Sequence, residues 1–177
     1  MLKFTKLTRL SLHNNLITKI ENLDSLVNLQ KLYLDHNRIR CLEGLRNCPK
    51  LEEIDMSNQK LPRKVRFTFD EYSLAAISGS LVRINLASTN IQDCKPIYFC
   101  DNLEFLDLRD NFIEGLDDQV IPILNTMQRL RSLDLRDNKV QLEARYREQI
   151  IMEGRTLKEL DGKTIRDQDR RYLFALA

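Results

Sequence analysis

The sequence is short of the residues that phosphate-binding and metal-binding sites need. Its 177 residues include only five glycines, which leaves no glycine-rich phosphate-binding loop. The two histidines, His13 and His36, have only Asp35 nearby as a carboxylate, and a metal site needs more ligands than that. No Cys-His or Ser-His-Asp set can be placed on one face of the chain. We therefore expect a protein that is not an enzyme and that holds no metal or other cofactor.

Long apolar runs and paired cysteine motifs are also absent. No stretch of 18 apolar residues occurs, so no membrane-spanning helix is predicted, and residues 1–12 are too polar for a signal peptide. The four cysteines show no C-x-x-C spacing, and there is no N-x-S/T glycosylation site. These absences favour a reducing, cytoplasmic setting with buried thiols over disulfides or zinc.

Neither sign of charge dominates the chain. Its 28 Lys and Arg residues against 26 Asp and Glu residues leave a net charge of +2, too small to indicate a nucleic-acid partner by itself. The hydrophobic share of 42% and the charged share of 31% are those of a globular protein. The length suits one elongated domain.

What the sequence does contain is leucine in a regular pattern. Six segments fit L-x-x-L-x-L-x-x-N-x-L, the signature of leucine-rich repeats, and their starts lie 22, 22, 30, 22 and 27 residues apart. The six segments begin at Leu7, Leu29, Leu51, Leu81, Leu103 and Leu130. The pattern predicts an α/β solenoid with a curved parallel sheet and a convex side of 3₁₀ or helical turns.

Each repeat predicts one short strand followed by a turn with a polar anchor. Alternating leucines such as Leu10 and Leu12 point inward from the strand. The polar residue at the turn bonds backbone groups that become free where the strand ends. These turn residues are Asn15, Asn37, Gln59, Thr89, Asn111 and Asn138. Because Gln59 and Thr89 flank the longest spacing, we expect the array to be irregular between them.

Three segments interrupt or end the repeats. Residues 62–80 form an insertion in the third repeat, with a short helix over 70–78 that Asp70 caps. Residues 117–128 have helical spacing. We therefore divide the chain into six repeats over 1–142 and a C-terminal cap over 143–177.

The two ends of the solenoid carry separate expectations. The last helix, over 166–177, is expected to dock on the final repeat through Tyr172, Leu173 and Leu176. The first strand begins near Leu10 with no cap ahead of it. We expect the surface that carries Leu2, Phe4 and Leu7 to meet another protein or a second copy.

The insertion and the tail resemble those of a known family. Residues 146–151 and 157–165 are similar to the C-terminal cap of intracellular leucine-rich repeat proteins. Residues 58–62, a basic stretch, Phe67 and a short helix before Leu81 resemble the family of protein phosphatase 1 regulatory subunit 42-like leucine-rich repeat proteins. The resemblance covers nearly the whole chain, although this chain begins two repeats later than the members of that family. It implies a non-catalytic protein of centrosomes, basal bodies and cilia that contacts the phosphatase and microtubule-associated proteins.

The insertion also contains a candidate docking motif. Lys64-Val65-Arg66-Phe67 has the pattern of a basic residue, Val or Ile, any residue, and Phe or Trp that docks on protein phosphatase 1. The mechanism is strand addition, in which Val65 and Phe67 fill two apolar pockets of the partner and Lys64 meets an acidic rim. The alternative is that Val65 and Phe67 pack into the core of the solenoid itself.

A second candidate site is the concave face of the sheet. Strand residues that alternate with the leucines project there, and aromatic and Arg residues are enriched at the centres of interfaces. The binding residues predicted on this face are Tyr33, Asp55, Phe105, Asp107, Arg109, Asp134 and Arg136. The alternative is a solvated face whose Asp and Arg side chains pair with one another.

These observations favour a cytoplasmic interaction scaffold of the cytoskeleton, at cilia or centrosomes. Its expected partners are the protein phosphatase 1 catalytic subunit and microtubule- or axoneme-associated proteins, with no nucleic acid and no membrane. One alternative is a purely structural microtubule or axoneme component without a phosphatase contact. The other is a ribonucleoprotein subunit, against which the near-neutral charge argues.

Overall fold

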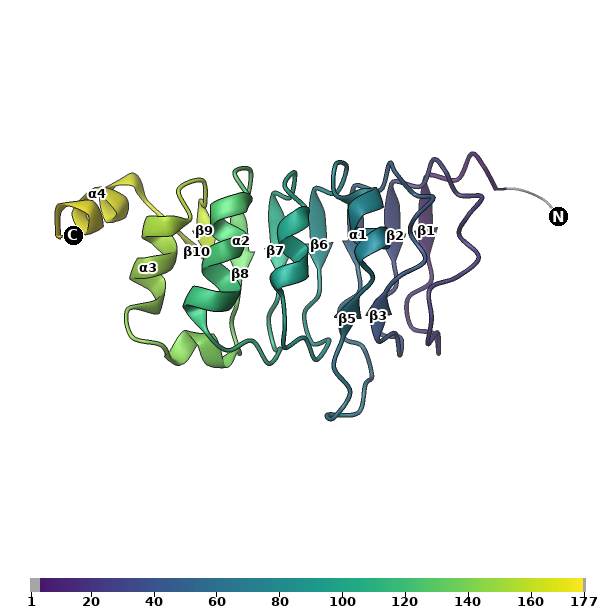
Figure 1. Ribbon diagram of the computed structural model, residues 1–177, viewed down its shortest axis with the longest axis horizontal. Helices are drawn as coiled ribbons and strands as arrows, with labels where there is room; N and C mark the ends of the chain where they lie inside the picture. Colours follow the sequence, from purple (N-terminus) through teal and green to yellow (C-terminus); the bar gives the residue numbers. More distant parts are fainter. Residues whose placement is uncertain (1–3, 177) are drawn as a thin grey trace.

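The backbone of the fold is one sheet of eight strands that lie side by side along the long axis of the molecule (Figure 1). The computed structural model describes residues 4–176. Within this sheet each neighbouring pair from β1 to β9 is parallel, and the last strand, β10, pairs antiparallel with β9. In sheet order the strands are β1 Arg9–Ser11, β2 Lys31–Tyr33, β4 Glu53–Asp55, β6 Arg83–Asn85, β7 Phe105–Asp107, β8 Ser132–Asp134, β9 Glu159–Leu160 and β10 Lys163–Thr164. The predicted parallel solenoid is confirmed.

Among the described residues, the return segments on the other side of the sheet carry no helix in the first two repeats, and helical elements occupy them from α1 onward. A two-stranded parallel sheet, β3 Cys41–Leu42 with β5 Thr68–Phe69, lies among them. The helical elements are α1 Glu71–Ile77, η1 Lys95–Phe99, η2 Leu116–Val120, α2 Ile121–Thr126, η3 Lys139–Leu142, α3 Tyr146–Glu153 and α4 Asp167–Leu176. Helices occupy both interruptions at which they were predicted, and η2, a π-helical turn, leads directly into α2.

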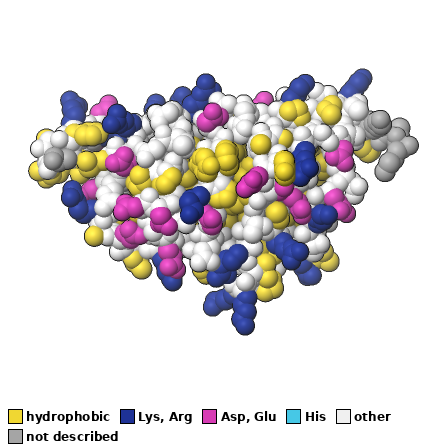
Figure 2. Space-filling view, viewed as in Figure 1, with side chains coloured by type: hydrophobic (Ala, Val, Ile, Leu, Met, Phe, Trp, Pro, Cys, Tyr) yellow, Lys and Arg dark blue, Asp and Glu magenta, His cyan; other side chains and the backbone are white. Residues whose placement is uncertain are grey.

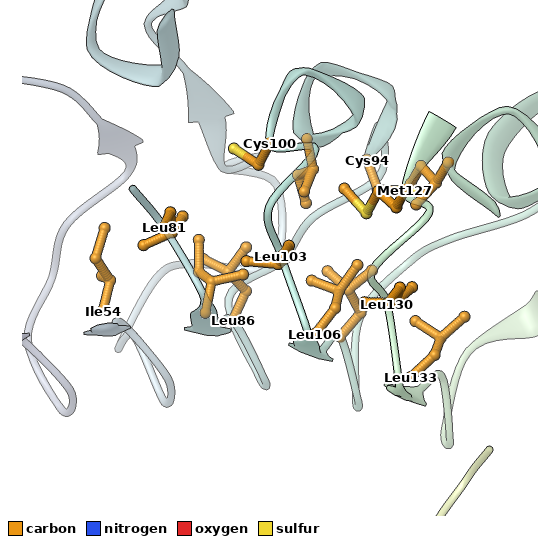
Figure 3. Packing of buried hydrophobic residues seen from close by; sticks show 14 of the residues in the cluster. Ile54, Leu81, Leu86, Cys94, Cys100, Leu103, Leu106, Met127, Leu130 and Leu133 are labelled. Atoms are coloured by element: carbon orange, nitrogen blue, oxygen red, sulfur yellow. The ribbon is translucent and has the colours of Figure 1, made fainter. Parts of the chain in front are cut away.

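The core lies between successive repeats, where leucines of equal register stack on one another (Figure 3). Ile84 pairs in register with Leu106, and Leu106 pairs with Leu133. These side chains are almost fully buried, as are the leucines that precede each strand, such as Leu103 and Leu130. No repeat buries its apolar face alone, so each repeat depends on both of its neighbours.

The polar turn residues form the predicted hydrogen-bonded array inside this core. The Asn111 side chain donates to the carbonyls of Leu86 and Leu108 and accepts from the amide of Ile91. It therefore links two repeats and leaves none of its own polar atoms unpaired. Asn37, Gln59 and Asn138 bond in the same way, whereas Asn15 in the first repeat is exposed.

The expected irregularity falls at Thr89. Its hydroxyl bonds Leu86 and Asn111 but is too short to reach the amide of Leu61 in the preceding repeat. That amide donates to the carbonyl of Gln59 instead, at 2.8 Å. The array is thus broken at the point where the insertion separates two repeats.

The insertion is anchored at its helical end by a local cap. The Asp70 carboxylate accepts hydrogen bonds from the amide and the hydroxyl of Ser73, both within 2.9 Å. These two bonds cap the N-terminus of α1 with the Asp70 side chain, as predicted. They also lower the pKa of Asp70, although burial acts in the opposite direction. The hydroxyl of Ser73 also accepts from the amide of Leu45, which joins the helix to the repeat before it.

Helix α4 closes the C-terminal end through fewer contacts than the sequence predicts. Leu173 is buried, but Tyr172 and Leu176 are 66% and 64% exposed, so the expectation that all three dock is wrong for those two. The anchor is Arg170, whose guanidinium donates to the carbonyls of Ile151, Gly154 and Leu157. A single charged residue on α4 thereby satisfies the carbonyls left open around the end of α3.

Arg170→Met is therefore expected to lower the free energy of unfolding by about 1.5–3 kcal/mol, because charge-assisted hydrogen bonds to three carbonyls are lost. Hydrogen exchange of residues 167–176 should rise with it, since the anchor of α4 is gone. The matched control is Arg171→Met, an exposed neighbour on the same helix. Equal exchange in the two variants would show that Leu173 alone holds the helix.

At the other end, strand β1 forms the outer edge of the sheet. Leu7 and Leu10 are only partly buried there, and Phe4 is exposed. Leu2, the third residue expected on this surface, lies outside the described residues. The contact predicted for this edge stays a prediction.

Candidate binding face

The outer face of the eight-stranded sheet carries all seven residues predicted for the concave surface. We call it the sheet face. Each strand contributes the residues on either side of its central buried one, so side chains from adjacent repeats stand in rows. On this face the predicted residues lie in two hydrogen-bonded groups and in the lining of a hollow between them.

The first group joins β7 and β8 and is built from alternating charges. The Arg109 guanidinium donates to both carboxylate oxygens of Asp107, from Nε at 3.0 Å and from Nη2 at 2.7 Å, and its Nε lies 3.5 Å from Asp134. Arg136 pairs with Asp134 at 2.6 Å. Hydrogen bonding to the aspartates raises the pKa of both Arg109 and Arg136. The pairing expected for the alternative, a solvated face, is therefore present: Arg109 and Arg136 each pair with the Asp two residues before them, and only the Arg109–Asp134 contact crosses strands.

The second group joins the N-terminal strands around Glu53. The Lys31 ammonium lies 2.8 Å from the Glu53 carboxylate, which also accepts from the Tyr33 hydroxyl at 3.1 Å. The hydrogen bond from Lys31 lowers the pKa of Glu53. Arg9 stacks over the Tyr33 ring, 4.9 Å from its centre, so Tyr33 is held from both sides.

Between the two groups the face is hollowed. A cavity of about 260 Å³ is lined by residues of β4, β6, β7, β8 and β9, among them Asp55, Arg83 and Phe105. Asp55 accepts a hydrogen bond from the Asn85 amide at 3.0 Å. The Arg83 guanidinium lies 3.7 Å from the centre of the Phe105 ring. This cover leaves Phe105 half-buried.

The predicted binding residues do not include Arg83, although its position completes the centre of the face. The sequence does indicate this position, because the alignment of the repeats places Arg83 beside Phe105 on neighbouring strands. The result is an aromatic ring and a guanidinium in contact, flanked by aspartates that are already paired.

The structure contradicts the exposure expected for the docking motif. Phe67 is only 3% exposed and packs edge-on against Phe69, with ring centres 5.4 Å apart. Val65 is half-buried, while Lys64 is exposed. The alternative of core packing therefore holds for Phe67, whose ring is not available to a partner's pocket.

The backbone of this segment is also not extended as strand addition requires. The amide of Val65 donates to the carbonyl of Pro62 at 2.9 Å, which closes a turn. The Asn90 side chain donates to the carbonyls of Pro62 and Val65, at 3.1 Å each. The segment is fastened to the following repeat before it reaches Phe67.

Chemically reactive groups are buried or isolated. All four cysteines are free, and burial raises the pKa of Cys94 and Cys100 to about 12, so both stay protonated at neutral pH. Within residues 4–176, no group of three His, Cys, Asp or Glu side chains is placed to hold a metal ion. No helix among these residues has the length and apolarity needed to cross a membrane.

Comparison with known proteins agrees with this geometry. A family model described as leucine-rich repeats in two copies matches residues 5–47 and 27–65. The fold is that of leucine-rich repeat proteins. Such folds are typically non-catalytic interaction scaffolds, and no catalytic family is indicated.

Solved leucine-rich repeat proteins superimpose on most of the chain. An internalin from Listeria monocytogenes matches with a TM-score of 0.69 and 25% identity over 88% of this chain. A leucine-rich repeat protein from Leptospira interrogans gives the same TM-score at 20% identity over 88% of the chain, and shows the fold alone. The chain spans 41% and 37% of these two proteins.

A further likeness is to a chain of the Drosophila melanogaster SNF/U2A′ complex. Its TM-score is 0.53 at 22% identity, over 94% of this chain and 79% of that one. At this identity the likeness extends to the fold only.

Proposed function

We propose that this leucine-rich repeat protein is a non-catalytic scaffold that binds a protein partner through the sheet face, with Arg83 and Phe105 at the centre of the contact. Leucine-rich repeat proteins generally mediate protein–protein interactions. The observation that carries the proposal is the Arg83–Phe105 contact of 3.7 Å above a hollow on the open sheet. Aromatic and Arg residues are the types that supply most of the binding energy at interface centres.

The paired charges around this centre support the same conclusion. Binding costs free energy when mobile side chains become ordered, by about 0.5–1.5 kcal/mol for each long side chain. Arg109 and Arg136 are already fixed on Asp107 and Asp134, so most of that cost is absent here. A fixed pattern of both signs also selects among partners by charge complementarity.

The variant pair Arg83→Ala and Phe105→Ala is expected to weaken partner capture by roughly tenfold or more, in line with hot-spot losses of about 2 kcal/mol. The measurement is quantitative capture from extracts of the source cells, with thermal unfolding recorded in parallel. Tyr72 and Arg46 form a matched control, because Arg46 stacks on the exposed Tyr72 ring at 4.4 Å on helix α1. If Arg46→Ala with Tyr72→Ala removes the partner instead, the binding surface is the helical side.

A narrower form of the proposal rests on the resemblance of the insertion and the cap. It holds that the partners are the protein phosphatase 1 catalytic subunit and microtubule- or axoneme-associated proteins, at cilia or centrosomes. Because Phe67 is buried, we place such a phosphatase contact on the sheet face rather than on Lys64, Val65 and Phe67. The rivals, a structural axonemal component and a ribonucleoprotein subunit, predict no phosphatase contact.

Titration of the purified phosphatase catalytic subunit against the whole chain distinguishes the narrower proposal from its two rivals. The narrower proposal predicts saturable binding that the Arg83→Ala and Phe105→Ala pair abolishes and that Lys64→Ala leaves unchanged. Absence of binding at tens of micromolar would reject it, and a diffuse distribution of the tagged chain in ciliated cells would reject the location.

A further inference from the structure

A second surface lies away from the sheet face, where the insertion meets the first repeats. A groove of about 840 Å³ opens there, and its lining combines the cations Lys19, Arg38, Arg40 and Lys60 with the apolar residues Leu61, Pro62 and Val65. We call it the basic groove. Figure 2 shows Lys and Arg side chains gathered around the loop that projects at the bottom of the view, with apolar side chains between them.

The positive side chains are held together by the repeat geometry. The amide of Arg38 donates to the carbonyl of Ile17, and the amide of Lys60 donates to the carbonyl of Asn37. Each bond holds its residue against the preceding coil, and the 22-residue spacing of the repeats places Arg38 and Lys60 at equivalent positions in adjacent coils. Both residues line the same groove.

The charge of the groove is not neutralised within the described part of the chain. Arg38, Arg40 and Lys60 are exposed, and none forms an ion pair with a described residue. The lining contains one carboxylate, that of Glu43. On the sheet face, by contrast, Lys31 and Arg109 each have a carboxylate partner.

The apolar side of the groove is rigid. Asn90 fastens the carbonyls of Pro62 and Val65, and the turn between them is closed by its own hydrogen bond. Leu61 and Val65 are half-buried, so each still offers part of its side chain to a ligand. Arg66 is directed elsewhere, onto Gln92 and the Phe112 ring. The groove therefore pairs a fixed apolar wall with a set of unpaired cations.

We propose that the basic groove binds an acidic peptide segment of a partner protein, with carboxylates on Arg38, Arg40 and Lys60 and an aliphatic side chain against Leu61 and Val65. A peptide fits better than a nucleic acid, because no aromatic ring lines the groove for bases to stack on. The apolar wall has no counterpart in a phosphate backbone. The basic groove is separate from the sheet face, and this inference does not depend on the function proposed for the sheet face.

The test uses the whole chain and a fluorescein-labelled peptide of repeated Glu-Glu-Leu-Glu-Glu, followed by anisotropy. The variant Arg38→Glu with Lys60→Glu should weaken binding by about tenfold or more. Its matched control is Arg155→Glu with Lys158→Glu, two exposed residues of another basic hollow and the same change in net charge. The control should change the affinity by less than about twofold, and added salt should weaken binding to the wild-type chain.

Two further measurements decide the class of ligand. Val65→Ala should weaken binding of the peptide but leave its salt dependence unchanged, because it removes only apolar contact. Binding to a single-stranded RNA of equal length, or to vesicles with anionic lipid, should be weaker than binding to the peptide. Equal losses in the two charge-reversal variants, or tighter binding of the RNA or the vesicles, would overturn the proposal.

Discussion

Replacing Phe67 by Ala is expected to lower the free energy of unfolding by about 3–5 kcal/mol, the usual cost of removing a buried phenylalanine. The ring is 3% exposed and packs against Phe69 within the insertion. The loss leaves a void between β5 and its neighbours that the hydrogen-bonded turn before it cannot fill. Equilibrium denaturant titration measures the change.

Tyr72→Ala is the matched control for Phe67→Ala. Tyr72 lies in the same insertion but is 68% exposed, so its removal should change stability by no more than about 0.5 kcal/mol. Nearly unchanged stability in Phe67→Ala would mean that the ring is free in solution. The docking motif would then be available to a phosphatase after all.

Leu108→Ala should lower the free energy of unfolding by about 2–5 kcal/mol. Leu108 is 1% exposed, and its carbonyl accepts from both Asn111 and Asn138. Because each repeat is stable only between its neighbours, the damage should spread, and amide exchange should rise in β6 and β8 as well as in β7.

The exposed Leu142 provides the comparison for this variant. Leu142 is 86% exposed, so Leu142→Ala should leave the denaturant midpoint almost unchanged. A loss below about 0.5 kcal/mol in Leu108→Ala would place this side chain outside the core and contradict the register of the sheet.

The fold could be predicted from the sequence because each repeat carries its own strand and turn pattern, and this pattern recurs along the chain. Each strand pairs with the next at the position of the same leucine, for example Leu106 with Leu133. Asn111 and Asn138 sit where the repeat pattern places them, and their bonds follow from that position alone. The Asp70 cap is equally local, since it needs only Ser73 three residues later.

The side chains that sequence reasoning misplaced are those whose surroundings come from distant segments. Phe67 follows a basic, proline-containing stretch that reads as solvated, but Asn90 holds this stretch against the next repeat. Tyr172 and Leu176 have helical spacing, yet Arg170 fixes α4 at an angle set by carbonyls of another helix.

We propose that the sheet face is the surface through which this chain binds a protein partner. Site-specific photocrosslinking tests it most directly, with benzoylphenylalanine placed at Ser132, beside the central hollow, or at Tyr72 on helix α1. The account predicts that the captured partner crosslinks from position 132 and not from position 72. Crosslinks from position 72 alone would contradict it.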